Sequence, residues 1–260
     1  MRINGADLYS EVDGSGDPVL LLHGGFCSLE SLRPVSDALV PDRRVLAFER
    51  PGHGRSADVD GEYGYERGLA DTVAYLDAHA LGSVDVVGYS DGAIIGLLLA
   101  LRHPARVRSL VAISANLDPS GFTHSAEAAG MPVLDAQEPA EPGPDVERRH
   151  YDRLSPDGPE HADVVLRKLF RLWTEEPRID PAALTDVTAA TLVMSGDRDT
   201  IRPDHSLLIA SSIPGAQLCI VPGTSHALVA ERPDLVAALV RQFVSDAAAR
   251  RSTGRRPARS

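Results

Sequence analysis

The sequence predicts an α/β fold, in which a mostly parallel sheet carries helices on both faces. Three observations support this prediction. Short apolar runs typical of strands alternate with longer segments of helical periodicity along most of the 260 residues. Val19–Leu22 is a continuous apolar run, as expected for a central parallel strand that is buried on both faces. Val86–Ile94 passes from an apolar strand through Gly-x-Ser-x-Gly into an apolar helix.

Each element follows from the pattern of its residues. The strands share short apolar or β-branched runs, and they are predicted at 8–12, 19–22, 44–48, 81–87, 107–113, 190–194 and 217–221. The helices share apolar residues at helical spacing, and they are predicted at 65–80, 94–101, 164–173 and 235–247. The turn residues 13–18 after the first strand predict that it belongs to an N-terminal hairpin.

One long segment interrupts the alternation of strands and helices. Residues 116–188 open with a stretch rich in Gly, Pro, Ser and Glu and then become helical, which predicts a cap inserted into the core domain. The core is therefore expected in two parts, 1–115 and 189–247, followed by a basic disordered tail over 248–260. Trp173, on the predicted cap helix, is expected to pack the cap onto the core rather than to contact substrate.

Composition argues against several classes of function. A net charge of −11 is unfavourable for binding nucleic acid. No apolar run approaches the roughly 20 residues that a membrane helix needs, and residues 1–7 lack the apolar segment of a secretory signal. Cys27 and Cys219 do not form a disulfide framework, which favours a reducing, cytoplasmic location. The spacing of His and Cys matches no metal motif, so the expected partner is a small-molecule substrate, with neither cofactor nor metal.

Ser90 is the candidate nucleophile. Gly-x-Ser-x-Gly is a weak pattern in a chain with 22 glycines, but here it lies between a predicted strand and a predicted helix. Such a turn holds the serine in a strained backbone conformation, where side chains two residues before and after it would collide. Gly88 and Gly92 are therefore expected at these positions. The following helix points its N-terminus at the reacting centre.

A serine hydroxyl needs a base to take its proton, and the base needs a group that orients it. His226 is the candidate base, because it alone among nine histidines follows a core strand and precedes the last helix. Asp197 and Asp199, in the loop after the predicted strand 190–194, are both candidates for the orienting acid. Asp199 lies further along the loop and can therefore reach toward the histidine.

Two backbone N–H groups must stabilise the negative charge that develops on the substrate oxygen. One is expected from Asp91, the residue after the nucleophile. The other is expected from the loop after the strand 19–22, with Gly25 as first choice and Phe26 as second. His23, in the same loop, is expected to brace the loop by hydrogen bonding rather than to act as a base.

Five motifs between residues 20 and 233 together resemble the α/β-hydrolase superfamily, in which the nucleophile, the acid and the histidine follow in this order. They are His23-Gly24-Gly25, Arg50–Ser56, Gly88–Gly92, Gly196–Asp199 and Gly223–His226. The resemblance implies an α/β-hydrolase fold with a mostly parallel eight-stranded sheet, helices on both faces and a helical cap between strands six and seven. It also implies that Asp199, rather than Asp197, is the acid and that His226 is the base. Glu49 stands where relatives often carry Asp.

The motifs and the resemblance favour a hydrolase that cleaves a small carboxylic ester, lactone or thioester with Ser90, Asp199 and His226. Three alternatives use the same fold. One is hydrolysis of a C–C bond in a β-diketone-type substrate, and another is a non-heme haloperoxidase-like or perhydrolase-like activity. The third is a binding protein that kept the fold and lost the chemistry, although an intact Ser, Asp and His set argues against it. A dehalogenase is disfavoured because the nucleophile position holds Ser rather than Asp.

Overall fold

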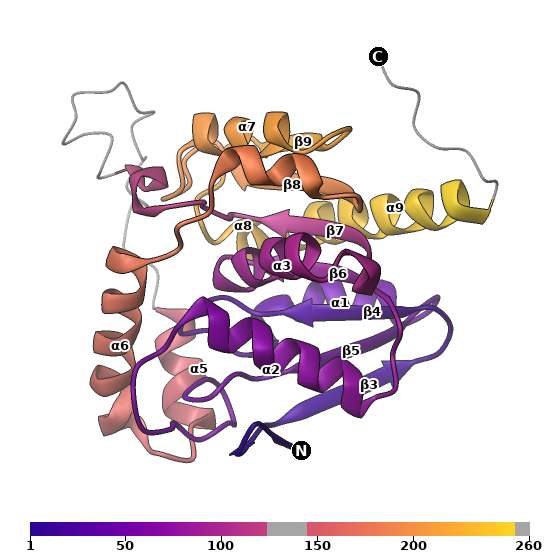
Figure 1. The fold of residues 1–260 in the computed structure, drawn as a ribbon. Coiled ribbons are helices and arrows are strands. Elements are labelled where there is room, and N and C mark those ends of the chain that lie inside the picture. The colour runs from indigo at the N-terminus through magenta and orange to yellow at the C-terminus, as the bar shows by residue number, and fades with distance from the viewer. Residues whose placement is uncertain (124–144, 253–260) are drawn as a thin grey trace.

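The computed structural model describes residues 1–123 and 145–252, and within them the main sheet has seven strands. Their order across the sheet is β3-β5-β4-β6-β7-β8-β9 (Figure 1). Only β3 runs antiparallel to its neighbour, β5, and every other pairing is parallel. The strands are β3 (Ser10–Gly14), β4 (Pro18–Leu22), β5 (Arg44–Phe48), β6 (Val84–Tyr89), β7 (Val107–Ile113), β8 (Ala190–Gly196) and β9 (Gln217–Val221). The predicted mostly parallel α/β sheet is confirmed.

The N-terminal part of the sheet differs from the prediction in two ways. The expected eighth strand is absent from the main sheet, because β1 (Arg2–Ile3) and β2 (Ala6–Asp7) have two residues each and pair only with each other. The expected hairpin is also wrong, since β3 pairs with β5 instead of β4. Both edges of β4 are already taken by the parallel strands β5 and β6, so β3 can join only at the outer edge of β5.

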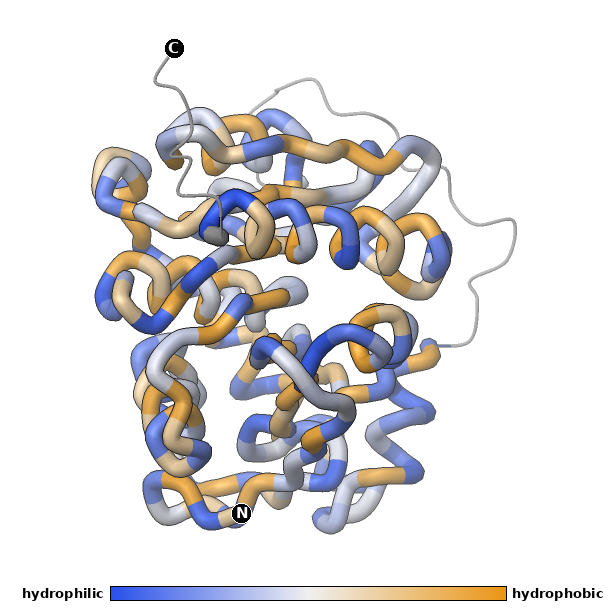
Figure 2. The backbone as a smooth tube through the Cα atoms, turned by 90° about the vertical axis from the view of Figure 1, so that its right-hand side faces the viewer, coloured by the Kyte–Doolittle hydropathy of each residue, from blue (hydrophilic) through white to orange (hydrophobic). Residues whose placement is uncertain are grey.

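Helices cover both faces of the sheet (Figure 1). Side chains of β4 alternate between the two faces. Leu20 and Leu22 join the core beneath α2 (Tyr65–Ala78) and α3 (Asp91–Arg102), while Val19 and Leu21 join the core beneath α1 (Arg33–Leu39) and α9 (Pro233–Ser252). Burial on both sides explains why this strand reads as an unbroken apolar run. In Figure 2, hydrophobic and hydrophilic residues alternate along the helices, as expected for helices with one face on a sheet. The helices of these layers are α1 (Arg33–Leu39), α2 (Tyr65–Ala78), α3 (Asp91–Arg102), α7 (Pro203–Ser212), α8 (Leu228–Glu231) and α9 (Pro233–Ser252).

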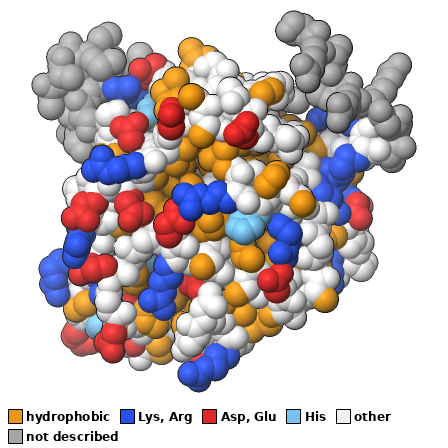
Figure 3. All heavy atoms as spheres, viewed as in Figure 1, with side chains coloured by type: hydrophobic (Ala, Val, Ile, Leu, Met, Phe, Trp, Pro, Cys, Tyr) orange, Lys and Arg blue, Asp and Glu red, His pale blue; other side chains and the backbone are white. Residues whose placement is uncertain are grey.

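The segment predicted as a cap carries two further helices between β7 and β8. These are α5 (Val146–Leu154) and α6 (Ala162–Glu175), which lie together beyond one end of the sheet (Figure 1). The buried face of α6 joins the main core through Val165, Leu169 and Leu172. Its outer face is charged, and acidic and basic side chains are interspersed over this region of the surface (Figure 3). Residues 124–144 of the predicted cap lie outside the described residues.

The C-terminal helix is longer than predicted. It continues past residue 247 to Ser252, so residues 248–252 belong to α9 instead of the predicted disordered tail. Arg251 donates to both carboxylate oxygens of Asp85, at 3.1 and 3.5 Å, and Asp85 is a fully buried residue of β6. Arg108 and Ser109 bind the same carboxylate at 2.8 and 2.7 Å. The rest of the predicted tail lies outside the described residues.

None of the helices in the described part of the chain combines the length and the apolar character that crossing a bilayer requires.

The contact between Arg251 and Asp85 predicts a measurable contribution of the end of α9 to stability. We expect Arg251→Ala to lower the free energy of unfolding by about 1–2 kcal/mol, because a buried carboxylate loses one of its charged donors. The matched control is Arg241→Ala on the same helix, whose ion pair with Asp42 is more than half exposed and should change stability by less than about 0.5 kcal/mol. Urea unfolding of both variants tests this, and equal effects would contradict it.

Candidate active site

Ser90 lies on a strained turn between the end of β6 and the start of α3. Its backbone has φ 54° and ψ −119°, a conformation that non-glycine residues rarely adopt. A Cβ on Gly88 would lie 2.3 Å from the Gly92 carbonyl oxygen, and one on Gly92 would lie 2.0 Å from that of Leu22. Only glycine fits at either position, so the two glycines expected from the sequence permit the close approach of strand and helix.

His226 connects Ser90 to Asp199. Its Nε2 lies 3.0 Å from Ser90 Oγ, and its Nδ1 lies 2.6 Å from Asp199 Oδ1. Because the carboxylate can only accept, Nδ1 carries the proton that it donates to Asp199, and Nε2 is left to accept the serine proton. The three side chains come from the turn after β6, the loop after β8 and the loop after β9. The structure thus brings the predicted nucleophile, acid and base into one hydrogen-bonded chain.

Asp199 is buried and held by further donors. Its Oδ1 accepts from the backbone N–H of Ile201 at 2.9 Å, and its Oδ2 accepts from the Ser114 hydroxyl at 2.5 Å. Burial opposes ionisation of this carboxyl, but the charge and hydrogen bond of His226, with the other donors, keep the pKa of Asp199 below its usual value. The rival Asp197 accepts instead from the Thr224 N–H at 3.1 Å, so it links the two loops as a turn residue.

Ser114 was not among the predicted site residues. It follows β7 directly, has φ 56° and is buried. A polar residue directly after a buried strand, at the edge of the sheet where Ser90 lies, is the signal that could have identified it. Its hydroxyl fixes the carboxylate that in turn orients His226.

Opposing influences act on the imidazole of His226. Burial disfavours its charged form, but the carboxylate of Asp199 favours that form through its charge and its hydrogen bond, and Asp91 adds to this effect. The net result is a pKa of His226 above the ordinary value for histidine. The backbone of His226 is also held, because Tyr89 donates its hydroxyl to the His226 carbonyl at 2.9 Å.

The loop after β4 is braced as the sequence predicts. His23 Nδ1 donates to the Gly24 carbonyl at 2.7 Å, and its Nε2 accepts from the backbone N–H of Arg50 at 3.0 Å. Arg50 also donates to the Gly24 carbonyl, at 2.8 Å. Of the two candidate donors in this loop, Phe26 has φ 56° and stacks on Tyr151 of α5, with ring centroids 5.0 Å apart. Gly25 lies beside Asp91, since a Cβ there would be 2.7 Å from Asp91 Oδ2.

The Asp91 carboxylate binds side chains from α2, from α6 and from the loop after β5. It is 1% exposed, and its Oδ1 accepts from Tyr65 Oη of α2 and from Trp173 Nε1 of α6, each at 2.9 Å. Its Oδ2 forms an ion pair with Arg50 at 3.5 Å. Trp173 therefore packs onto the core as expected, and it also makes a hydrogen bond that its residue type alone does not reveal.

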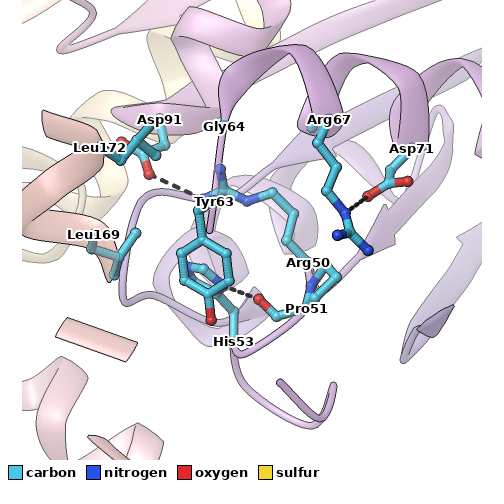
Figure 4. Close-up of a pocket in the computed structure, with 11 residues that line it drawn as sticks. Arg50, Pro51, His53, Tyr63, Gly64, Arg67, Asp71, Asp91, Leu169 and Leu172 are labelled. Carbon is cyan, nitrogen blue, oxygen red and sulfur yellow. Dashed lines mark hydrogen bonds and ion pairs between the residues drawn. The ribbon is translucent and has the colours of Figure 1, made fainter. Parts of the chain in front are cut away.

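A small, partly open pocket lies next to Asp91, and Figure 4 shows Arg50 reaching across it toward that carboxylate. Among residues 1–123 and 145–252, three buried atoms of the residues that line this pocket have no hydrogen-bond partner: Arg50 Nε, His53 Nε2 and Asp91 Oδ2. Burial and the neighbouring charge of Arg50 lower the pKa of His53 to about 3, so its ring is neutral and Nε2 is an acceptor. The pocket is lined by Arg50, Pro51, His53, Tyr63, Gly64, Arg67, Gly68, Asp71, Asp91, Leu169 and Leu172.

The site region also contains a cysteine thiol. Cys27 is buried near Ser90, because a Cβ on Gly24 would contact both Cys27 Sγ and Ser90 Cβ within 3.2 Å. Burial raises the pKa of the Cys27 thiol well above its usual value. Within residues 1–123 and 145–252, no three His, Cys, Asp or Glu side chains gather closely enough to hold a metal ion.

The chain is similar to known hydrolases over nearly its whole length. The model of the alpha/beta hydrolase family matches residues 19–239. The "Putative carbamate hydrolase RutD" of Azorhizobium caulinodans is 29% identical, over 88% of this chain and 92% of the relative. The 2-hydroxymuconate semialdehyde hydrolase of Pseudomonas putida is 31% identical, over 90% and 89%. The enol-lactonase from Burkholderia xenovorans LB400 matches in fold, with a TM-score of 0.76 and 22% identity over 94% of this chain and 98% of that one.

The geometry around His226 predicts how its pKa depends on its partner. We expect the pKa of His226 to lie above 6.5 in the native chain and to fall in Asp199→Asn, because burial then acts without the opposing carboxylate charge. Titration of the imidazole signals by NMR measures both values. Asp197→Asn is the control and should leave the pKa of His226 unchanged. A fall of equal size in that variant would contradict the assignment of Asp199.

Proposed function

This chain belongs to the alpha/beta hydrolase family, and we propose that it is a serine hydrolase that cleaves a small carboxylic ester, lactone or thioester. The observation that supports this proposal most strongly is the hydrogen-bonded chain from Asp199 through His226 to Ser90. These three residue types, in this hydrogen-bonded order, are the ones that nucleophilic catalysis by serine uses.

In the first half of the proposed reaction, Ser90 Oγ attacks the substrate carbonyl carbon while His226 Nε2 takes the serine proton. The carbonyl oxygen becomes an oxyanion, which the backbone N–H groups of Asp91 and Gly25 stabilise, with Phe26 as the alternative to Gly25. His226, now protonated, is stabilised by Asp199 at 2.6 Å. It then gives its proton to the leaving oxygen or sulfur, and an acyl group remains on Ser90.

In the second half, His226 takes a proton from water, which attacks the acyl carbon. The oxyanion forms again in the same place, and its collapse releases the carboxylic acid and returns the proton to Ser90. The raised pKa of His226 supports this exchange, because the Asp199 carboxylate stabilises the protonated imidazole that forms in each half of the reaction.

We further propose that residues 116–188 form a cap over this site. Two contacts support it. Tyr151 of α5 stacks on Phe26, and Trp173 of α6 lies against Gly25, where a Cβ would be 2.6 Å from its Cζ2. Both contacts are made by the loop that is proposed to supply an oxyanion donor, so substrate would bind beneath α5 and α6.

A second candidate function is hydrolysis of a C–C bond in a β-diketone-type substrate. It is favoured by the 31% identity to a 2-hydroxymuconate semialdehyde hydrolase over nine-tenths of the chain. The same three residues would serve this reaction, and the leaving group would be a carbon atom instead of an oxygen or sulfur.

The proposal predicts that Ser90→Ala abolishes activity. We expect turnover of any accepted ester to fall by about 10⁴-fold or more, because the acyl-enzyme can no longer form. Labelling by a fluorophosphonate probe should be complete in the native chain and absent in the variant. As a matched control, Ser225→Ala changes a neighbouring serine whose hydroxyl bonds Glu231, and it should still be labelled. Native turnover in Ser90→Ala would refute the mechanism.

A panel of substrates separates the two candidate functions. We expect faster turnover of short-chain esters or lactones than of β-diketones and their vinylogous relatives, with all activity lost together in Ser90→Ala. Hydrolysis of the panel is followed by release of acid at constant pH, and a carbamate ester is included because of the similarity to RutD. A kcat/KM that is highest for the diketones would instead support the second candidate.

A further inference from the structure

We propose that Trp173 and Asp91 are positioning residues that hold the oxyanion hole in shape, so that the hole is complete only while α6 is docked on the core. This inference rests on the proposed function, because it takes Asp91 and Gly25 as the residues whose N–H groups stabilise the oxyanion. It goes further by assigning roles to the side chain of Asp91 and to a residue of the predicted cap.

The first step concerns Asp91 itself. It is the first residue of α3, so its amide is one of the helix N–H groups that lack an intrahelical partner. Its carboxylate is buried and bound by Tyr65, Trp173 and Arg50. Since the amide and the carboxylate belong to one residue, donors that fix the side chain also limit how the amide can turn.

The second step concerns Gly25, on the opposite side of the proposed hole. A Cβ on Gly25 would lie 2.6 Å from Trp173 Cζ2 and 2.7 Å from Asp91 Oδ2. The indole and the carboxylate therefore press directly on the backbone of this loop, and any larger residue would displace it. The side chains of Trp173 and Asp91 thus limit the positions of both N–H groups that the proposed mechanism uses, those of Asp91 and Gly25.

The third step is that Trp173 comes from a different part of the chain than the groups it touches. It lies 82 residues from Asp91 and extends from α6, which is anchored by Leu169 and Leu172 in the core. Lys168 of α6 adds an ion pair of 2.7 Å with Asp58. If α6 lifts from the core, Trp173 leaves both Asp91 and Gly25.

The fourth step is that Asp91 can lose Trp173 without being left unpaired. Tyr65 and Arg50 belong to the core and still bind the carboxylate when the indole is gone. At Asp91 itself, undocking of α6 therefore costs one hydrogen bond and leaves no unpaired buried charge. The helix also gives up the burial of Leu169 and Leu172 and the ion pair of Lys168. The hole can be loosened and restored as α6 moves.

The experiment compares Trp173→Phe, Asp91→Ala and the double variant. Trp173→Phe removes the N–H donor and part of the indole that faces Gly25 while keeping an aromatic ring. We expect kcat to fall about 10-fold with KM within twofold, because misplacing an oxyanion donor weakens binding of the transition state rather than of the substrate. The double variant should lose less than the product of the two single losses, since Trp173 and Asp91 act on the same two N–H donors.

A trifluoromethyl ketone provides a readout that a merely structural role would not move. Ser90 Oγ adds to its carbonyl carbon, the serine proton goes to His226, and the ketone oxygen becomes an anion in the proposed hole. We expect its inhibition constant to rise about 10-fold in Trp173→Phe, in proportion to the loss of kcat/KM. The matched control is Arg171→Gln on the exposed face of α6, which breaks an ion pair with Glu62 and should change neither value.

Because the chain contains one tryptophan, tryptophan fluorescence reports on the surroundings of Trp173, which include its contacts with Asp91 and Gly25. We expect the emission of Asp91→Ala to move to longer wavelength while its circular dichroism stays native; if Asp91→Ala does not fold, Asp91→Asn and Trp173→Phe decide. Unchanged kcat and unchanged inhibition in Trp173→Phe overturn the proposal, and so do additive losses in the double variant. Failure of the proposed function is a different result, in which the native chain neither reacts with fluorophosphonate nor depends on Ser90.

Discussion

The backbone conformation of Ser90 is the constraint on which the site depends. A positive φ at a non-glycine residue is costly, and it persists because β6 and α3 are held within a distance that leaves no room for side chains at Gly88 and Gly92. Packing in the centre of the fold keeps these two elements close, since β6 lies between β4 and β7 and α3 is buried along most of its length. The Ser90 hydroxyl therefore has a fixed position, toward which the loops after β8 and β9 bring Asp199 and His226.

Features that local residue patterns determine could be predicted, and features that depend on distant packing could not. Ser90, His226 and Asp199 each follow a recognisable strand, so the sequence located them, although it took the family resemblance to prefer Asp199 to Asp197. The length of α9 was missed because its last turn is held by Asp85, 166 residues earlier in the chain. The residue patterns predicted seven strands, and the count of eight came from the family resemblance; β1 and β2 are two residues long and pair only with each other.

The hydrogen bond between Trp173 and Asp91 is another feature that the residue pattern could not predict. A tryptophan on an amphipathic helix predicts that the helix packs on the core, and α6 does so. The partner of the indole N–H, the Asp91 carboxylate, comes from a distant part of the chain and is brought near only by folding. Ser114 is a similar case, since it gains its role from the loop after β8. In both cases a residue outside the recognised motifs stabilises one within them, so the motifs understate how much of the chain the proposed chemistry recruits.

The buried thiol of Cys27, beside Ser90, affects how electrophilic reagents are expected to react at this site. Because Cys27 is enclosed and its pKa is raised, it stays protonated at neutral pH, and a protonated thiol is a poor nucleophile. An electrophile that reaches this part of the molecule therefore meets the hydroxyl of the proposed nucleophile, Ser90, and nearby a sulfur atom that remains protonated. Covalent probes directed at Ser90 are therefore expected to spare this cysteine, because its thiol is both enclosed and protonated.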